Sequence, residues 1–300
     1  MKTESPQDVR RILKKIRAIE IRTRHLANSM FAGSYHSAFK GQGMNFEEVR
    51  EYQPGDEIRA IDWNVTARFG HPYIKQFTEE RELNVVLMVD LSASGNYGSR
   101  HLSKREIAAE IAATLAFSAI RNGDKVGLLL FTDKVEAFIP PHKGRSHVLR
   151  VIREVLYYRP ENTGTDIGEA LRYLNRILNR RSIVFLISDF MAPDFSKPLG
   201  LASRRHDLIA VPVLDPHEDA LPAIGRIMLE DEETGDQIEI DTSSPRVRRR
   251  FEATARKRRD ELSRLLRVTG IDAIPLRTDE DYLPALKAFF ERREMRRLHM

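Results

Sequence analysis

Oxygen-bearing side chains follow an apolar stretch of this chain at alternating positions. Residues 83–89 are mostly apolar and β-branched, and Asp90, Ser92 and Ser94 come directly after them. A short continuous apolar run predicts a strand that is buried on both faces of a sheet. In open α/β sheets, ligands bind at the carboxyl ends of such strands. One carboxylate and two hydroxyls form an all-oxygen set, which suits a hard divalent cation such as Mg²⁺ better than zinc.

Two further segments carry oxygen-bearing residues at the ends of expected elements. Thr165 stands between Gly164 and Asp166, and Asp189 follows the mostly apolar residues 182–188. We expect these two loops and the first one to converge on one edge of the sheet. A plainer interpretation of the first loop, a strand followed by a serine-rich turn or helix cap, stays open. Asp166 either joins the site or caps the helix that follows it.

Length and composition bound the class of protein. The 300 residues are enough for one large α/β domain with an additional segment. The absence of cysteine excludes disulfides, a thiol nucleophile and a Cys-ligated metal, and it fits a reducing cytoplasmic location. The apolar runs are far shorter than the ~20 residues of a membrane span. The charged N-terminus has no apolar core of the kind found in secretion signals.

Positive charge is concentrated at the two ends of the chain. The net charge is +5 over residues 1–25 and +7 over residues 245–300, which leaves −7 for the middle. Such polarity predicts docking to a charged partner, or else only the solvated faces of two amphipathic helices. We expect the basic helix at 9–26 to pack on the protein itself. Peripheral membrane contact is the alternative. Nucleic-acid binding is not expected, because the basic runs at 246–250 and 256–259 lack interleaved aromatic residues.

Strands alternate with helices along most of the chain. The expected strands lie at 83–89, 126–131, 182–188, 208–214 and 271–276, with a short antiparallel edge strand at 135–139. The expected helices lie at 103–121, 146–156, 167–178, 196–204, 247–268 and 282–293. This alternation predicts an α/β fold with a doubly wound, mainly parallel sheet and right-handed crossovers.

The chain is expected to have two parts. Residues 1–80 form an N-terminal helical and strand extension, with a helix at 9–26, a glycine-rich loop at 32–43 and short strands at 46–52 and 73–77. The loop lacks the lysine-serine pattern of a phosphate-binding loop. Residues 81–292 form the α/β domain, with an acidic β-hairpin inserted at about 216–244, and residues 293–300 form a basic tail. The hairpin is either simply solvated or docks a partner.

The segment between the two short strands has an unusual composition. Pro54 and Gly55 predict a turn, and Asp56 is placed to cap a helix. The charged side chains of the segment are expected to form an ion-pair lattice that fixes it against the sheet, a structural role that we favour over a binding site. The members of this lattice are Asp56, Arg59, Asp62 and Arg68.

These motifs together resemble a known family. The sequence REYQPGDEIRAIDWNVTAR at 50–68, the acidic run at 79–82 and DLSAS at 90–94 resemble the bacterial domain-of-unknown-function family 58, which is treated as related to von Willebrand factor A (VWA) domains. The resemblance covers most of residues 33–280 and continues through GDKVG, GTD, ISDF and DPHE, at 123–127, 164–166, 187–190 and 215–218. It implies a VWA-like, Rossmann-like fold with a metal-ion-dependent adhesion site, and partnership with a MoxR-type AAA+ ATPase.

The resemblance also implies a role for each site residue. Ser92 and Ser94 would bind the ion through their hydroxyls, and Thr165 would do so directly or through water. Asp90 and Asp189 would act mainly through water and through their charge. The ion would be Mg²⁺, with Mn²⁺ or Ca²⁺ as alternatives, and one position would stay open for a carboxylate of a partner. Such a site is a binding device.

A catalytic role is the rival hypothesis. DLSAS resembles the start of a haloacid dehalogenase, but Ser92 stands where that chemistry needs a second aspartate. The sequence has no G-x-S-x-G elbow, H-E-x-x-H helix or Walker motif. We therefore expect a non-catalytic adaptor or chaperone component that works with a MoxR-type ATPase or with the client of that ATPase. The alternative is a metal-dependent phosphatase or nuclease that uses Asp90 and Asp189.

Overall fold

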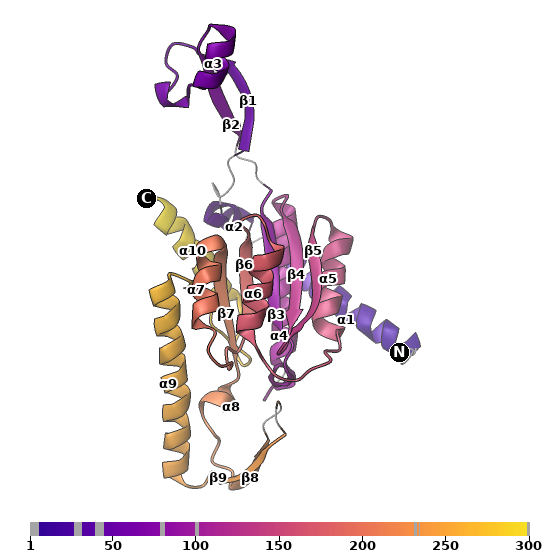
Figure 1. Ribbon diagram of the computed structural model, residues 1–300. Helices are drawn as coiled ribbons and strands as arrows, with labels where there is room; N and C mark the ends of the chain where they lie inside the picture. The colour runs from indigo at the N-terminus through magenta and orange to yellow at the C-terminus, as the bar shows by residue number, and fades with distance from the viewer. Residues whose placement is uncertain are drawn as a thin grey trace.

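A computed structural model describes residues 6–26, 32–39, 45–78, 82–99, 102–230, 233 and 235–298. A seven-stranded sheet forms the centre of the molecule (Figure 1). Its strands are β3 (Asn84–Asp90), β4 (Lys125–Phe131), β5 (Val135–His142), β6 (Ile183–Ser188), β7 (Asp207–Leu214), β10 (Asp272–Ala273) and β11 (Leu276–Arg277). Their order is β10–β7–β6–β3–β4–β5, and β11 also pairs with β7. Neighbours are parallel except β5, which is antiparallel to β4, so the expected mainly parallel α/β fold is confirmed.

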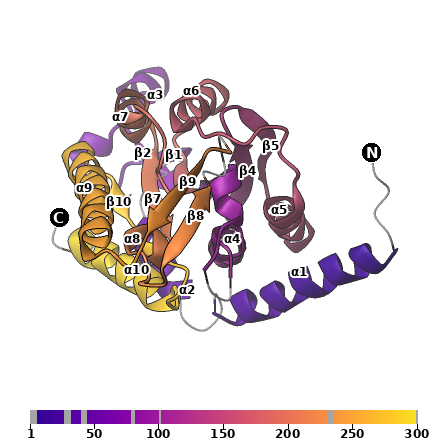
Figure 2. The ribbon, with the colours of Figure 1, turned by 90° about the horizontal axis from the view of Figure 1, so that it is seen from below.

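Helices cover both faces of this sheet (Figure 2). One face is covered by α1 (Pro6–Leu26), α2 (Ala32–Phe39), α4 (Lys104–Arg121), α5 (Arg145–Tyr157) and α10 (Leu283–Leu298). The other face is covered by α6 (Ile167–Ile177), α7 (Ser196–Arg205) and α9 (Pro245–Thr269). Within β3, Val85 and Leu87 pack into the first layer, and Val86 and Met88 pack into the second. Burial on both faces explains why this strand is apolar rather than alternating.

The last predicted strand, 271–276, is divided in the structure. It forms the two short strands β10 and β11, and Pro275 lies in the gap between them. Ile274 still donates its N–H to the Ala210 carbonyl at 2.8 Å, but proline has no N–H to continue the ladder. The other predicted strands and helices of the α/β domain agree with the structure to within a few residues.

The basic helix α1 packs on the protein itself, as the sequence favoured. Ile16 and Ile19 are buried against α4 and α5. Lys15 and Arg22 pair with Glu106 and Glu110 of α4. The apolar side of the described part of this helix is therefore part of the core. Among the described residues, the structure has no helix with both the length and the apolarity needed to cross a membrane.

The predicted glycine-rich loop is wrong over its first part, which is the helix α2. Tyr35, Ala38 and Phe39 are buried at helical spacing, and the Tyr35 hydroxyl donates to Asp124 Oδ2 at 3.0 Å. These contacts with the α/β domain stabilise a helix that the local composition does not favour. Residues 40–43 of the predicted loop lie outside the described residues.

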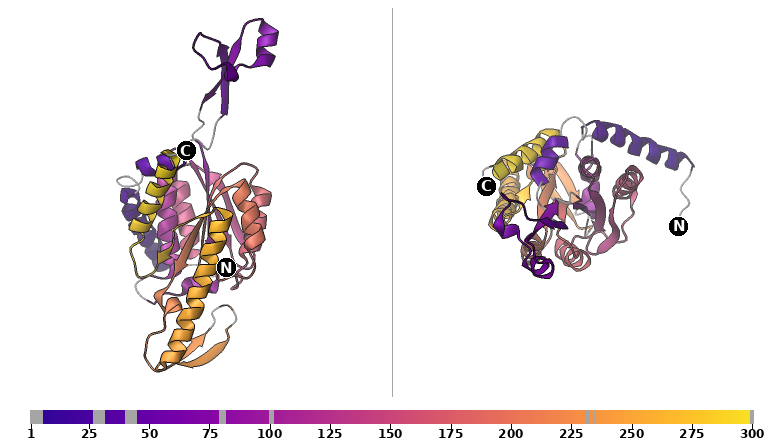
Figure 3. Two further views of the ribbon diagram at one scale, coloured as in Figure 1. Left: turned by 90° about the vertical axis from the view of Figure 1, so that its left-hand side faces the viewer. Right: turned by 90° about the horizontal axis from the view of Figure 1, so that it is seen from above.

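The segment with the unusual composition lies away from the seven-stranded sheet. It joins β1 (Asn45–Glu51) to β2 (Tyr73–Thr78), and this hairpin extends from the end of the sheet opposite to the carboxyl ends of the parallel strands (Figures 1 and 3). The predicted packing of the segment against the sheet is therefore wrong. The segment instead packs on its own hairpin, where Ile61 bridges to Ile74. Residues 79–81 of the acidic run lie outside the described residues.

The charged residues of this segment also differ from the prediction. Asp56 does not cap a helix: it accepts two hydrogen bonds from the Arg50 guanidinium, at 2.9 and 2.8 Å, and these bonds lower the pKa of Asp56. Asp62 caps the helix α3 (Trp63–Phe69) by accepting from the Asn64 and Val65 amides. Each aspartate thus fixes a local turn, and Arg50, the ion-pair partner of Asp56, is not a member of the expected lattice.

The C-terminal residues continue a helix where a basic tail was expected. α10 extends to Leu298. Arg293 is half-buried and bonds both carboxylate oxygens of Asp207, at 2.6 and 2.8 Å, and it also pairs with Asp272. This residue therefore ties the helix to the sheet instead of starting a solvated tail.

His206 is buried just before β7 and is held in its neutral form. Its Nδ1 accepts a hydrogen bond from the Ser182 amide at 3.3 Å, and its Nε2 has no partner among the described residues. Burial, and then the charges of Arg205 and Arg181, lower the pKa of His206 from 6.5 to about 4. Between pH 6.5 and about pH 4, His206 is therefore protonated in the unfolded chain but neutral in the folded protein. Stability is lost as the pH falls through this window.

We expect this loss to disappear in His206→Asn, whose side-chain oxygen can accept from Ser182 but takes up no proton. Between pH ~7.5 and ~4.5, the free energy of unfolding should fall by about 2.5 kcal/mol more in the wild-type protein than in the variant. Urea unfolding followed by circular dichroism measures the difference. His71→Asn changes an exposed histidine and is the matched control. Equal pH dependence in all three proteins would contradict the prediction.

Candidate functional site

The carboxyl ends of β3 and β6 bring four of the predicted site residues together. These two strands are parallel neighbours, so Asp90 and Asp189 reach the same edge of the sheet. The hydroxyls of Ser92 and Ser94 are 3.1 Å apart, and Ser94 Oγ donates to Asp189 Oδ2 at 2.9 Å. A single network of oxygen atoms therefore joins the two loops.

Asp90 is turned into the protein. Its Oδ1 accepts from the Ser92 amide at 2.9 Å, and its Oδ2 accepts from Ser188 Oγ at 2.7 Å. Burial, and then the negative charge of Asp189, raise the pKa of Asp90 to about 7. A positive charge placed nearby would favour the ionised form of this carboxyl.

Thr165 lies at the same edge, but its hydroxyl has a different partner. The Ala93 amide donates to the Thr163 carbonyl at 2.9 Å, which holds the two loops side by side. Thr165 Oγ1 donates to Oε1 of Glu233 at 2.6 Å. Asp166 accepts from the Glu169 amide at 2.8 Å and so caps α6, which settles the alternative that the sequence left open.

Lys104 is a member of the site that the sequence analysis missed. Its Nζ donates to Asp189 Oδ2 at 2.9 Å and also pairs with Glu218 of the short helix α8 (Pro216–Asp219). The side chains of Lys104 and Asp189 are only 4% and 3% exposed. Burial opposes both charges, but their attraction raises the pKa of Lys104 and lowers that of Asp189. The ammonium group of Lys104 therefore places a positive charge at this buried edge of the sheet.

A signal for Lys104 was present in the sequence. Lys104 is the first residue of α4, directly after the capping residue Ser103. A positive charge is unfavourable there, because the amino end of a helix carries a partial positive charge. A lysine at this position therefore calls for nearby carboxylates. The sequence does not say which carboxylates these are.

A small cavity lies among these residues. Its volume is about 20 Å³, and its polar lining includes Asp90, Ser92, Ser94, Lys104 and Asp189. This is enough space for one water molecule or one small ion. Neither at this cavity nor anywhere else do the described residues contain a group of three or more His, Cys, Asp or Glu side chains that could hold a metal ion. Lys104 and Arg105 also line the cavity, so a cation here would depend on the oxygen atoms of Ser92, Ser94 and the two aspartates, a donor set that suits Mg²⁺.

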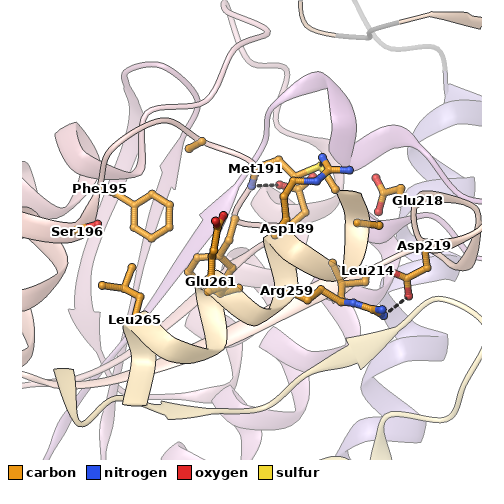
Figure 4. A pocket seen from close by; sticks show the side chains of 15 residues that line it. Asp189, Met191, Phe195, Ser196, Leu214, Glu218, Asp219, Arg259, Glu261 and Leu265 are labelled. Atoms are coloured by element: carbon orange, nitrogen blue, oxygen red, sulfur yellow. Dashed lines mark hydrogen bonds and ion pairs between the residues drawn. The ribbon is translucent and has the colours of Figure 1, made fainter. Parts of the chain in front are cut away.

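A larger pocket adjoins the site (Figure 4). It has a volume of about 410 Å³, lies beside α9, and shares Asp189 and Glu218 with the site. Phe195, Leu262 and Leu265 give it an apolar lining. At its rim, Arg259 of α9 pairs with Asp219 at 2.7 Å. This pocket could accept an apolar side chain of a ligand whose polar group is bound at the neighbouring edge of the sheet.

The fold and the site define a mixed α/β protein with a mainly parallel sheet and an oxygen-rich cluster at its carboxyl edge. The sequence pattern of the family described as "Protein of unknown function DUF58" matches residues 48–261, and the chain belongs to this family. An uncharacterised protein of Mycobacterium tuberculosis is 32% identical over 277 residues, which cover 91% of this chain and 87% of that protein. The uncharacterised protein YeaD of Bacillus subtilis is 29% identical over 107 residues, 36% of this chain and 25% of that one.

Some solved structures match the chain at low similarity. The conserved hypothetical protein BatB from Bacteroides thetaiotaomicron has 18% identity and a TM-score of 0.43, over 71% of this chain and 99% of that one. An aerotolerance-related membrane protein from Bacteroides fragilis has 16% identity and a TM-score of 0.46 over the same shares. Mussel proximal thread matrix protein 1, with a zinc-occupied MIDAS motif, has 15% identity and a TM-score of 0.35, over 44% of this chain and 38% of that one.

Proposed function

We propose that this chain is a non-catalytic protein–protein interaction module with a VWA-type metal-ion-dependent adhesion site. Ser92, Ser94 and Thr165 would hold Mg²⁺ through their hydroxyls, and Asp90 and Asp189 would act through water and charge. The observation that carries the proposal is the chain of contacts from Ser92 to Ser94 to Asp189, beside a cavity of about 20 Å³. Loops that a rigid sheet holds in place are a common position for binding residues.

The charge of the site supports a cation. Asp90, Asp189 and Glu218 bring three carboxyl groups close to the one ammonium group of Lys104. Lys104 and Arg105 both line the cavity, so with all groups ionised the three carboxylates exceed the cations by one negative charge, which a bound cation would offset. When bound, the ion supplies directional attraction for a carboxylate, which the acids of the site would otherwise repel.

We further propose a MoxR-type AAA+ ATPase, or its client protein, as the partner, with the interaction in the cytoplasm. The partner would present an acidic residue to the site. An apolar residue next to that acid would enter the larger pocket beside α9, whose lining is mainly apolar. The combination of one charged and one apolar anchor is typical of specific interfaces.

The double variant Ser92→Ala/Ser94→Ala tests the ion site. We expect its affinity for Mg²⁺, measured by isothermal titration calorimetry, to fall at least about 100-fold, because two charge-dipole contacts are lost at about 1.5 kcal/mol each. Ser263→Ala changes an exposed serine of α9 and is the control. In surface plasmon resonance, the wild-type protein and Ser263→Ala should bind a purified MoxR-type ATPase more tightly than the double variant does. Unchanged Mg²⁺ affinity in the folded double variant would end the proposal.

A further inference from the structure

The inserted β-hairpin is held firmly at its base and contributes little to the core. It consists of β8 (Arg226–Glu230) and β9 (Gln237–Asp241). At the base, the amide and hydroxyl of buried Thr242 both donate to the Gly225 carbonyl, at 2.8 and 2.7 Å. Met228 and Ile238 remain 59% and 60% exposed, and no hairpin residue belongs to either hydrophobic cluster of the described residues. Its position beside the carboxyl edge of the sheet (Figure 1) is therefore not a requirement of core packing.

The tip of the hairpin reaches the loop that carries Thr165. The Glu233 carboxylate accepts from Thr165 Oγ1 at 2.6 Å, and the Glu233 carbonyl accepts from Thr163 Oγ1 at 3.3 Å. Gly164 lies between these contacts, and a Cβ atom on it would lie 3.8 Å from Glu233 Oε2. The hairpin thus delivers one carboxylate to the hydroxyl that the proposed site needs.

This contact brings further negative charge to an edge where Lys104 balances only part of the charge of the carboxylates. The tip is acidic, with Glu230, Glu233 and Asp236 among its described residues. The edge that it approaches already carries Asp90 and Asp189. Like charges repel one another, and the repulsion is strongest where the groups are buried. A divalent ion between the tip and the edge would turn the repulsion into attraction.

We propose that Glu233 is the chain's own ligand for the cation. Its carboxylate takes the coordination position that a partner carboxylate would otherwise fill. The inference rests on the proposed adhesion site and adds its regulation. In the resting protein the hairpin closes the site. A partner with an acidic residue binds by displacing Glu233, so its apparent affinity is reduced by the fraction of time that the hairpin is bound.

The test uses Mn²⁺ and Mg²⁺ alone, because the partner is not needed to see the hairpin close. Glu233→Gln keeps the shape of the side chain and removes its charge. We expect this variant to bind Mn²⁺ about tenfold more weakly than the wild-type protein in calorimetry. Glu230→Gln, which changes an exposed hairpin carboxylate paired with Gln237, should stay within about twofold of the wild type.

Amide hydrogen exchange provides a second measurement. Mg²⁺ should slow exchange in β8 and β9 of the wild-type protein and leave exchange in Glu233→Gln unchanged. If Glu233→Gln binds Mn²⁺ as tightly as the wild type, and its hairpin responds equally to Mg²⁺, Glu233 is not a ligand and the inference is overturned. The adhesion site would still stand if Ser92→Ala/Ser94→Ala loses the ion. If the wild-type protein binds neither ion, the proposed function itself fails.

Discussion

Replacing Lys104 by methionine is expected to lower the free energy of unfolding by about 3–5 kcal/mol, because it leaves buried carboxylates without their cation. Lys104 Nζ contacts Asp189 and Glu218, and the Asp189 side chain is 3% exposed. Methionine keeps most of the volume of the lysine stem, so the loss reports charge rather than a cavity. Urea unfolding near neutral pH, followed by circular dichroism, measures it.

Lys125→Met is the matched control for this experiment. Lys125 pairs with Glu82 at 3.0 Å, but both side chains are more than 40% exposed, so its removal should cost less than about 1 kcal/mol. Saturating Mg²⁺ should stabilise Lys104→Met more than the wild-type protein, because the ion supplies the missing positive charge. Similar losses in the two variants would mean that Lys104 does not neutralise buried carboxylates.

Replacing Phe39 by alanine is the second change with a large expected effect. Phe39 is 1% exposed, and its ring packs against Phe185 of β6 and Phe290 of α10, with the Arg293 guanidinium 4.9 Å above it. Truncation leaves a cavity and removes two edge-to-face ring contacts. We expect the free energy of unfolding to fall by about 3–5 kcal/mol.

The control for Phe39→Ala is Phe69→Ala, since Phe69 is 64% exposed and its ring contact is with Tyr73. This change should cost less than about 1 kcal/mol. Both variants are compared by urea unfolding with the same wild-type protein. We expect α2 to be an integral part of the domain, although it lies outside the residues that match the family pattern. A loss below about 1 kcal/mol for Phe39→Ala would contradict this expectation.

Most of the α/β domain follows from local patterns in the sequence. Apolar runs such as that of β6 are buried on both faces of the sheet, and the sequence marks them without ambiguity. The capping box of Ser103 and Glu106 likewise marks the start of α4. Local signals fail for α2, whose residues read as a loop. Its helix depends on the burial of Tyr35 and Phe39 against elements far away in the chain.

The parallel sheet and the strand ends that carry Asp90 and Asp189, with Ser92 and Ser94 after the first of them, are predictable from the order of residues. These features depend on periodicity and on the rule that parallel strands end at one edge. The pairing of Lys104 with Asp189 and the contact of Glu233 with Thr165 depend instead on the three-dimensional packing of the chain. The first contact joins residues that are 85 positions apart in the chain, and the second joins residues that are 68 positions apart. No local sequence pattern specifies the partners in such long-range contacts.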